Sequence, residues 1–202
     1  MVKKSIYPKT KRFDGNAQVF ITEKIDGSNL TIFKKDGEIH FATRNNIIQI
    51  PSDVENCKNI LYKGMYGWIQ DNHMRLCESL NEGSAICGEW IGMGNIKYPH
   101  LDKKFYMFAK ANIDEDLILK KINYIQDYFQ YSFVDKNIPD FIGIVPIVKT
   151  ESKNPSIQDL DMLYHEYCLS QNRQVEGFII YQNNEVEKYV RLKNGKMQDH
   201  HS

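Results

Sequence analysis

The residues best suited to chemistry lie in the stretch Glu23-Lys24-Ile25-Asp26-Gly27-Ser28-Asn29. Alternating apolar segments flank this stretch, which predicts a strand, a tight turn at Asp26-Gly27 and a second strand. A lysine held at a turn beside a carboxylate and an amide can act as a nucleophile when its amine is uncharged. Lysine suits this task because burial or nearby positive charge readily lowers the pKa of a lysine. The same pattern also fits a surface hairpin with a solvated lysine.

The elements that must position this stretch are predicted from periodicity and turn signals. A second hairpin is predicted at Lys35-Asp36-Gly37-Glu38. A capping box at Ser52 to Glu55 opens a helical pattern that runs to about Leu80, with breaks near Gly64 and Gly67. Further along, the patterns predict an amphipathic helix over 114–130, a β-rich run over 141–148 and a helix over 155–170.

One buried strand is predicted to end at a charged side chain. Apolar residues fill the segment 85–92, in which Glu89 is the carboxylate. A charged residue is rarely buried without a partner. Glu89 is therefore a candidate site residue, although a strand-end carboxylate in water fits the segment taken alone.

Length and composition describe a packed globular protein. The 202 residues are enough for one well-buried domain, and 42% are hydrophobic. No apolar run approaches the length of a membrane span, and the start Met-Val-Lys-Lys-Ser lacks the apolar core of a signal peptide. The four cysteines form no Cys-x-x-Cys pair and are interpreted as reduced thiols. We therefore expect a cytoplasmic protein with no membrane association.

The net charge is zero, which by itself does not indicate a nucleic-acid partner. The basic residues are nevertheless grouped near the two ends, and local basic groups can follow a phosphate backbone. The N-terminal group equally fits a solvated chain end. The two groups are Lys3, Lys4, Lys9, Lys11 and Arg12, and Lys188, Arg191, Lys193 and Lys196.

The stretch Lys24-Ile25-Asp26-Gly27-Ser28-Asn29 resembles motif I of the covalent nucleotidyltransferases, which include RNA ligases, DNA ligases and mRNA capping enzymes. With Glu23 in front, it is most similar to the ATP-dependent RNA ligases of the RNA-repair and RNA-editing type. Four more segments resemble further motifs of that family, in the family's order. Together the five segments extend over residues 23–194.

The resemblance implies a role for several residues around the nucleotide. Lys24 would form the covalent bond to AMP, Glu23 would contact the nucleotide, and Asn29 would position a phosphate or a metal-bound water. The Thr-Arg segment after the second hairpin implies that Arg44 points at the phosphates and the RNA end, where a fixed fork of donors suits phosphate. An exposed arginine at a strand end is the alternative for Arg44.

The segments around Glu89 and Phe108 resemble motifs III and IIIa. Gly94 and Tyr98-Pro99, which follow Glu89, also match the family. The resemblance implies that Glu89 binds the ribose and that Phe108 stacks on the adenine, a contact worth about 1–3 kcal/mol. The family has an aspartate directly after the aromatic residue, whereas this chain has Ala109.

The last two segments resemble motifs IV and V. The resemblance implies that Glu176 holds the divalent metal, for which a glutamate supplies hard oxygen ligands. It also implies two cations on the α-phosphate, from a Lys-x-Lys pattern that here reads Arg191-Leu192-Lys193. Strand alternation predicts that Arg191 and Lys193 share one face. Arginine preserves the charge of the first lysine but not its geometry.

As a whole, the resemblance implies an α+β fold of the ligase nucleotidyltransferase type, with antiparallel sheets flanked by helices and the nucleotide site between them. It implies ATP and Mg²⁺ or Mn²⁺ as cofactors. Lys24 would take AMP from ATP and pass it to an RNA 5′-phosphate. A 3′-hydroxyl would then attack that activated end and release AMP.

Three other functions share parts of this pattern: a capping-type guanylyltransferase, a DNA ligase and a non-catalytic nucleotide- or RNA-binding relic. The form of the motifs around Lys24 and Glu89 favours an RNA ligase over a DNA ligase. We further expect residues 1–202 to form a single nucleotidyltransferase domain, with no C-terminal OB or helical domain after Asn194. The joining of RNA ends would then be poor unless low salt or an accessory RNA-binding protein strengthens RNA binding.

Overall fold

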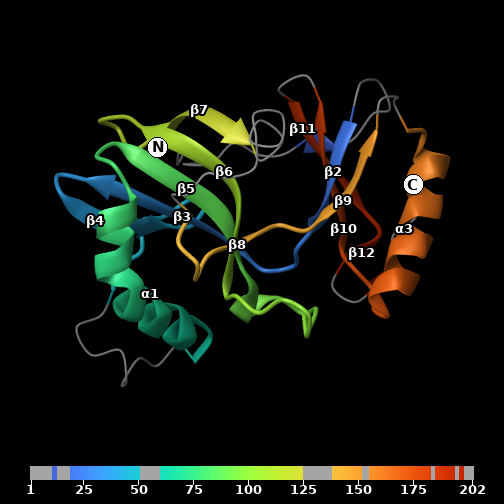
Figure 1. The fold of residues 1–202 in the computed structure, drawn as a ribbon, viewed down its shortest axis with the longest axis horizontal. Coiled ribbons are helices and arrows are strands. Elements are labelled where there is room, and N and C mark those ends of the chain that lie inside the picture. Colours follow the sequence, from blue (N-terminus) through green and yellow to red (C-terminus); the bar gives the residue numbers. More distant parts are fainter. Residues whose placement is uncertain are drawn as a thin grey trace. The chain divides into compact units, whose positions relative to one another are not determined.

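The computed structural model describes residues 11–12, 19–50, 60–124, 138–151, 155–182, 185–193 and 196–197. The described chain forms two compact units, each with its own sheet (Figure 1). Unit 1 takes its described residues from Gly27–Gly94 and Tyr98–Ile144, and unit 2 takes them from Lys9–Asp26, Asn95–Lys97 and Val145–Ser202. The basic residues Lys3, Lys4 and Lys9 and the predicted capping box at Ser52 to Glu55 lie outside the described residues.

Unit 1 is built on a six-stranded sheet with the strand order β4-β3-β5-β6-β7 and a short β8 beside β6. All pairs are antiparallel except β6 and β8, which are parallel. Its other elements are the helix α1 and the short 3₁₀ helix η1. The bounds are β3 (Ser28–Lys35), β4 (Glu38–Ala42), α1 (Ile60–Ser79), β5 (Ser84–Trp90), η1 (Ile91–Met93), β6 (Phe105–Ile113), β7 (Leu119–Tyr124) and β8 (Gly143–Ile144).

Helix α1 covers one face of the unit 1 sheet. Met65, Ile69 and Leu76 are buried on the helix and pack against sheet residues such as Leu30 and Met107. Their spacing of four and seven residues places them on one side of the helix. A second apolar cluster contains Phe33, Cys87 and Ala109, so the opposite face of the sheet is also partly covered.

Unit 2 is built on a five-stranded sheet with the order β1-β11-β10-β2-β9. The pairs are antiparallel except β1 and β11, which are parallel and place Arg12 opposite Lys188. A separate small ladder joins β12 to β13. The bounds are β1 (Lys11–Arg12), β2 (Val19–Lys24), β9 (Ile147–Glu151), α3 (Ile157–Gln171), β10 (Gly177–Gln182), β11 (Glu185–Val190), β12 (Leu192–Lys193) and β13 (Lys196–Met197).

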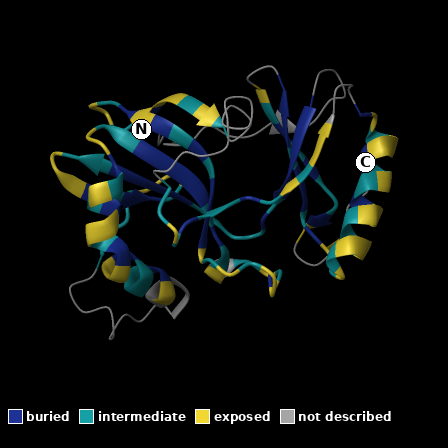
Figure 2. Cartoon of the chain, in the orientation of Figure 1, coloured by how far each residue is buried: buried dark blue, intermediate teal, exposed yellow. Residues whose placement is uncertain are grey.

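Helix α3 packs on the unit 2 sheet with one side and faces solvent with the other (Figure 2). Leu160 and Tyr164 are buried against Ile21 and Phe178. The helix begins with a complete capping box, in which the Ser156 hydroxyl accepts from the Asp159 N–H and the Asp159 carboxylate accepts from the Ser156 N–H. This start agrees with the predicted helix over 155–170.

The structure confirms several of the predicted elements. The second hairpin joins β3 to β4 with positive φ angles at Asp36 and Gly37. Helix α1 continues through Gly64 and Gly67, so the predicted breaks are wrong. A glycine inside a helix keeps its backbone hydrogen bonds and costs only about 1 kcal/mol relative to alanine, because more backbone entropy is lost.

The helix predicted over 114–130 is wrong in its described part. Leu119–Tyr124 forms strand β7, which pairs with β6. A turn precedes it, in which the Asp114 carboxylate accepts from the Ile118 N–H at 2.8 Å and Leu117 has a φ of 60°. The turn and the ladder with β6 satisfy the backbone groups that a helix would have used. Residues 125–130 lie outside the described part.

The predicted hairpin around Lys24 is also wrong, although both strands exist. β2 pairs with β10 and β9, whereas β3 pairs with β4 and β5, and the two strands belong to different sheets. Neither Asp26 nor Gly27 has the positive φ that a type I′ turn requires. The chain therefore leaves one sheet at Lys24 and enters another at Ser28.

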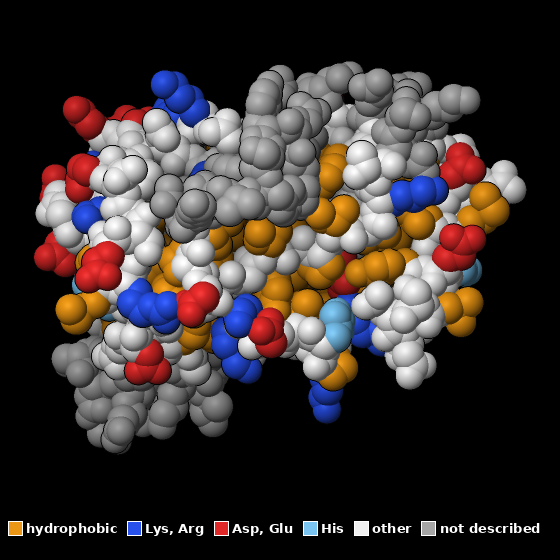
Figure 3. Space-filling model, viewed as in Figure 1, with side chains coloured by type: hydrophobic (Ala, Val, Ile, Leu, Met, Phe, Trp, Pro, Cys, Tyr) orange, Lys and Arg blue, Asp and Glu red, His pale blue; other side chains and the backbone are white. Residues whose placement is uncertain are grey.

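No helix in the described residues is long and apolar enough to cross a membrane. On the face drawn in Figure 3, acidic and basic side chains are interspersed, in keeping with the net charge of zero.

Candidate active site

Lys24 and Glu176 form the centre of the candidate site, in unit 2. Lys24 is the last residue of β2, and Glu176 directly precedes β10. The antiparallel ladder pairs Lys24 with Gly177, which brings the neighbouring Glu176 to the same end of the sheet. The Lys24 Nζ donates to the Glu176 Oε2 at 2.5 Å, and the two side chains are 22% and 16% exposed. The structure thus joins two residues that are 152 positions apart in the sequence.

The environment of Glu176 favours its protonated form. Burial raises the pKa of the Glu176 carboxyl above its usual value, and the nearby Lys24 ammonium opposes this shift without cancelling it. A carboxylate with a raised pKa is a better proton acceptor than a solvated glutamate. The partner of the candidate nucleophile is therefore also suited to accept its proton.

Behind Lys24, a buried network ties together the two chain segments that carry the central pair. The Glu23 carboxylate is fully buried and binds the Arg173 guanidinium with both oxygens at 2.7 Å. The Tyr167 hydroxyl donates to the same carboxylate at 2.8 Å. Glu23 precedes Lys24, and Arg173 lies three residues before Glu176. The network therefore fixes the backbone under both residues.

This burial argues against the direct nucleotide contact that was predicted for the Glu23 side chain. Consecutive side chains of a strand point to opposite faces, so Glu23 and Lys24 face different sides of the unit 2 sheet. A contact with a nucleotide would require Glu23 to leave Arg173. Arg173 and Tyr167 were not identified from the sequence. The position of Arg173 just before Glu176 could have suggested a role for Arg173, but the sequence gives no such signal for Tyr167.

Asp26 fixes a third segment of unit 2 near Lys24. Its carboxylate accepts from the backbone N–H groups of Asn95 and Ile96 at 2.6 and 3.0 Å. A carboxylate that accepts backbone N–H groups makes strong, charge-assisted hydrogen bonds. Asp26 therefore holds the segment Asn95–Lys97 rather than forming the predicted tight turn.

A cavity of about 390 Å³ opens among these residues of unit 2. Three cationic and two acidic side chains line it, together with polar backbone and amide groups. A polar cavity beside the central pair is suited to a charged ligand such as a phosphate group. The lining residues are Asp26, Asn95, Ile96, Lys97, Arg173, Gln174, Glu176, Leu192 and Lys193.

Of the two cations predicted to share a strand face, only Lys193 lines this cavity. Arg191 lies in a bend between β11 and β12, and its backbone N–H donates to the Glu176 carbonyl at 2.9 Å. Its guanidinium pairs with Asp161 at 3.3 Å and lies 6.0 Å from the Tyr164 ring centre, both on α3. The bend interrupts the strand alternation on which the same-face prediction depended, so that prediction is wrong.

In unit 1, Asn29 and Glu89 are directly opposite each other on β3 and β5. Their neighbours Leu30 and Trp90 belong to the cluster packed on α1, so Asn29 and Glu89 point to the other face of the sheet. The Asn29 Oδ1 is buried and has no hydrogen-bond partner within the described part of the chain. A buried amide oxygen of this kind is suited to a donor or cation supplied by a ligand.

Gly27 allows this arrangement because it lies against β5. A Cβ atom at this position would be 2.3 Å from the Trp90 carbonyl oxygen and 2.9 Å from the Glu89 Cγ. Only glycine can come so close to the neighbouring backbone without displacing it. The glycine of the Asp-Gly pair is thus explained by close packing in unit 1.

Phe108 lies at an irregularity of β6 on the same face as Glu89. The register shifts between Cys87 and Gly88, whose partners are Ala109 and Met107, so Phe108 has no direct partner on β5. Its half-buried ring packs against the cluster that contains Ala109. Ala109 itself is fully buried, and an aspartate there would need its own partner. This packing accounts for the alanine that departs from the family pattern.

Arg44 is exposed in a bend after β4. The turn that carries it is closed by the Thr43 N–H, which donates to the Asn46 carbonyl at 2.8 Å. The structure therefore distributes the predicted residues over the two units. Lys24, Glu176 and Lys193 belong to unit 2. Asn29, Arg44, Glu89 and Phe108 belong to unit 1.

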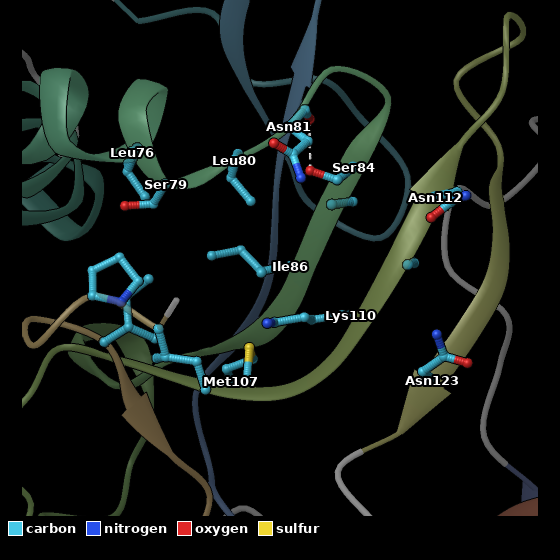
Figure 4. A pocket seen from close by; sticks show the side chains of 15 residues that line it. Leu76, Ser79, Leu80, Asn81, Ser84, Ile86, Met107, Lys110, Asn112 and Asn123 are labelled. Carbon is cyan, nitrogen blue, oxygen red and sulfur yellow. Dashed lines mark hydrogen bonds between the residues drawn. The ribbon is translucent and has the colours of Figure 1, made fainter. Parts of the chain in front are cut away.

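A second cavity, of about 240 Å³, lies in unit 1 on the side of the sheet that α1 covers (Figure 4). Leu76, Ile86 and Met107 form its apolar part, and the amine of Lys110 and several asparagines reach its polar part. None of the predicted site residues lines it. It faces away from Asn29 and Glu89 and is not part of the candidate site.

Comparison with known proteins agrees with these observations. A family model described as RNA ligase matches residues 17–194. No curated protein matched the chain.

Solved structures of similar fold include two variants of Naegleria gruberi RNA ligase and an archaeal RNA ligase. A Naegleria gruberi variant with AMP and Mn is 18% identical, with a TM-score of 0.58 and coverage of 91% of this chain and 57% of that chain. A second variant with ATP and Mn is 21% identical, with a TM-score of 0.59 and coverage of 87% and 50%. An archaeal ATP-dependent RNA ligase is 14% identical, with a TM-score of 0.61 and coverage of 91% and 48%. The chain thus spans about half the length of these structures, and the likeness establishes the ligase-type nucleotidyltransferase fold.

Proposed function

Because the chain belongs to the RNA ligase family, we propose that it is an ATP-dependent RNA ligase in which Lys24 forms a lysyl-AMP intermediate. The observation that carries the proposal is the close pair of Lys24 and Glu176 at a cavity lined by cations. A lysine amine beside a proton acceptor, next to a site for phosphate, is the arrangement that nucleophilic attack on ATP requires.

In the first step, the Lys24 Nζ attacks the α-phosphorus of ATP. A P–N bond forms, the bond from the α-phosphorus to the bridging oxygen of the leaving group breaks, and pyrophosphate departs. The amine must lose a proton, and the Glu176 carboxylate at 2.5 Å is placed to accept it. The Lys193 ammonium at the same cavity stabilises the negative charge that develops on the phosphate oxygens.

In the later steps, a phosphate oxygen of the RNA 5′ end attacks the same phosphorus and Lys24 leaves. A 3′-hydroxyl oxygen then attacks the activated 5′-phosphate, the phosphodiester forms and AMP departs. Phosphoryl transfer of this type depends more on positioning and charge neutralisation than on proton transfer. Arg44 is the exposed cation of unit 1 that we assign to the phosphates and the RNA end.

We assign the nucleoside of ATP to the face of the unit 1 sheet that carries Asn29, Glu89 and Phe108. The carboxylate of Glu89 is assigned to the ribose hydroxyls, and the half-buried ring of Phe108 to the adenine. The unsatisfied Asn29 Oδ1 supports a polar ligand at this face. The Naegleria structures contain AMP or ATP with Mn.

A divalent metal fits the chemistry of these residues. The Glu176 carboxylate supplies hard oxygen atoms, which Mg²⁺ and Mn²⁺ prefer. The described residues hold no group of three or more His, Cys, Asp or Glu side chains that could bind a metal without other ligands. We therefore assign the Glu176 oxygen that is not bonded to Lys24 as the metal ligand, and phosphate oxygens and water would complete the shell. When bound, the metal would neutralise charge on the phosphates.

The substrate that we propose is RNA with a 5′-phosphate and a 3′-hydroxyl end, in keeping with a role in RNA repair. A cytoplasmic location is likewise a proposal. It is supported by Cys77, Cys87 and Cys168, which are free thiols.

The test is to incubate the chain with ATP labelled at the α-phosphate and Mg²⁺ or Mn²⁺, and to map any adduct. We expect a labelled chain with the adduct on Lys24, and no label on the Lys24→Ala variant. The Lys120→Ala variant, which changes an exposed lysine of β7, serves as the matched control and should label fully. Label on another lysine in Lys24→Ala would reject the nucleophile.

The same assay separates the other functions. Labelling by GTP instead of ATP would indicate a guanylyltransferase, and preferential sealing of nicked DNA would indicate a DNA ligase. A folded chain that takes no label from any nucleotide would be a non-catalytic relic.

A further inference from the structure

The unit 2 cavity lacks the second phosphate-binding cation that the sequence predicted for it. The Arg191 side chain is bound to α3. Its guanidinium pairs with Asp161 at 3.3 Å, and the Arg191 side chain is only 15% exposed. It also contributes to the attachment of α3 through the nearby Tyr164 ring. Moving it to the cavity would break a half-buried ion pair.

The other cations at the cavity differ in whether a carboxylate of the protein already binds them. Arg173 is bound by both oxygens of the buried Glu23. Lys24 is bound by Glu176. Lys97 and Lys193 are exposed, and neither forms an ion pair within the described part of the chain. They are therefore the two cations of the cavity whose charge remains for a ligand.

Lys97 reaches the cavity because its segment is held in place. The residues Asn95–Lys97 belong to unit 2, although the chain on both sides of them belongs to unit 1. Asp26 binds two consecutive N–H groups of this segment, at 2.6 and 3.0 Å. Asp26 lies two residues after Lys24, so the nucleophile and Lys97 are both attached to one short piece of backbone. Because the backbone of Lys97 is held in this way, less conformational entropy is lost when its side chain binds a ligand.

We propose that Lys97 binds the α-phosphate of ATP together with Lys193, and so supplies the second cation that Arg191 does not. This inference rests on the proposed function, because it assigns a further residue to the same reaction. Two ammonium groups beside the non-bridging oxygens would stabilise the negative charge on these oxygens in the transition state, while the amine attacks and pyrophosphate leaves. Lys97 then acts in the first step, before any RNA is bound.

The test compares single-turnover adenylylation by Lys97→Ala, Lys97→Arg, Arg191→Gln and the control Lys120→Ala. We expect Lys97→Ala to lower the rate constant roughly 100- to 1,000-fold, as does the removal of one group that stabilises a developing oxyanion. Lys97→Arg should retain most of the rate, because it keeps the charge at the cavity. Lys120→Ala should match the wild type.

Arg191→Gln is expected to lower the midpoint of thermal unfolding while leaving the rate within about threefold of wild type, as measured on the folded protein. The reverse pattern, with full activity in Lys97→Ala and a large rate loss in a stably folded Arg191→Gln, would overturn the assignment.

A second arm distinguishes ATP from RNA as the source of the phosphate. Lysyl-AMP protein is prepared from each variant by long incubation, and transfer of AMP to a 5′-phosphorylated RNA is then measured. A Lys97→Ala variant that is normal in the first step and slow only in this transfer would show that Lys97 binds the RNA phosphate, which contradicts our proposal. If the wild type itself takes no label, the proposed function fails, and that result is distinct from a failure of Lys97 alone.

Discussion

At the scale of single residues, the candidate site depends on groups that are charged yet largely removed from water. Lys24 and Glu176 are each less than a quarter exposed and lie 2.5 Å apart. Removing such groups from water costs free energy, which their mutual attraction offsets only in part. Charged groups that are shielded from water are enriched at functional sites. The pair is therefore the residue-level feature on which the proposed chemistry depends most.

The raised pKa of Glu176 predicts how stability changes with pH. Its usual value is 4.5, and burial raises it in the folded protein. At a pH below both values Glu176 is protonated in the folded and the unfolded chain and imposes no cost. As the pH rises past 4.5, the unfolded chain loses this proton first, so the folded state loses stability until the pH exceeds the raised pKa.

The Glu176→Gln variant lacks this titration. Its free energy of unfolding, relative to that of the wild type, should increase as the pH rises across that interval and then level off. Urea unfolding of both proteins at a series of pH values from about 4 to 7 measures the difference. A difference that does not change with pH, or one that falls, would contradict the direction of the shift.

The buried pair of Glu23 and Arg173 predicts a large loss of stability when one partner is removed. Its side chains are 0% and 10% exposed. Glu23→Gln should lower the free energy of unfolding by about 3–5 kcal/mol, since the Arg173 charge would stay buried without its counter-charge. The matched control is the more exposed pair of Lys120 and Asp114, at 55% and 30%.

Lys120→Ala should cost no more than about 1 kcal/mol, because water and salt screen an exposed pair. Urea unfolding of both variants supplies the comparison. Equal losses for Glu23→Gln and Lys120→Ala would show that the network behind Lys24 adds little to the fold.

At the scale of elements, sequence reasoning succeeded where the deciding interactions are local. The capping box of α3 and the Asp36-Gly37 turn are formed by residues within a few positions of each other, so the pattern contains the information. It failed at Lys24, where β2 takes its partner from residues 177–181 and β3 takes one from residues 85–90. Such pairings depend on residues far apart in the chain, so they cannot be predicted from a segment of seven residues.

The same reason explains what was missed in the site. The family motifs identified Lys24 and Glu176, because each lies in a recognisable local pattern. Arg173 and Lys97 acquire their places through Glu23 and Asp26, by side-chain contacts that the sequence does not display. Arg191 was misplaced because a bend interrupts the alternation of β11 and β12.

The start of β10 offers an element-scale prediction. Gly177 has a φ of 153°, and a Cβ atom there would lie 2.0 Å from the Tyr189 carbonyl oxygen on β11. Gly177→Ala should cost about 1–3 kcal/mol of stability, because the backbone of one strand must move. It should also slow adenylylation, since Glu176 is the adjacent residue.

Gly64 in α1 is the matched control for this substitution. No atom lies within 4 Å of a Cβ built at Gly64. Gly64→Ala should stabilise the protein by about 0.5–1 kcal/mol, because alanine favours the helix. Thermal unfolding of both variants measures the two effects. A Gly177→Ala variant as stable as the wild type would show that β10 and β11 can separate without cost.

At the scale of the whole molecule, a net charge of zero must be reconciled with a polyanionic substrate. The fold does so by placing basic residues in register on two ladders of unit 2. The parallel pair of β1 and β11 places Arg12 beside Lys188 in the register of one sheet, and the β12–β13 ladder places Lys193 opposite Lys196. Unit 2 therefore has local groups of basic residues on a neutral protein.

The basic residues of unit 2 predict how RNA binding depends on salt. Each phosphate contact on a single strand contributes about 0.7 to the slope of log affinity against log salt concentration, through release of counterions. The double variant Lys188→Gln, Lys196→Gln should bind 5′-phosphorylated RNA more weakly and with a slope reduced by roughly 1.4. Fluorescence anisotropy across a salt series measures both quantities, and Lys120→Gln together with Lys35→Gln in unit 1 removes the same charge as a control. Adenylylation by the double variant should change less than RNA binding does, since neither lysine lines the cavity beside Lys24 and Lys188 acts on Glu176 only through its charge. An unchanged slope in the double variant, or an equal reduction in the unit 1 control, would show that RNA does not contact Lys188 and Lys196.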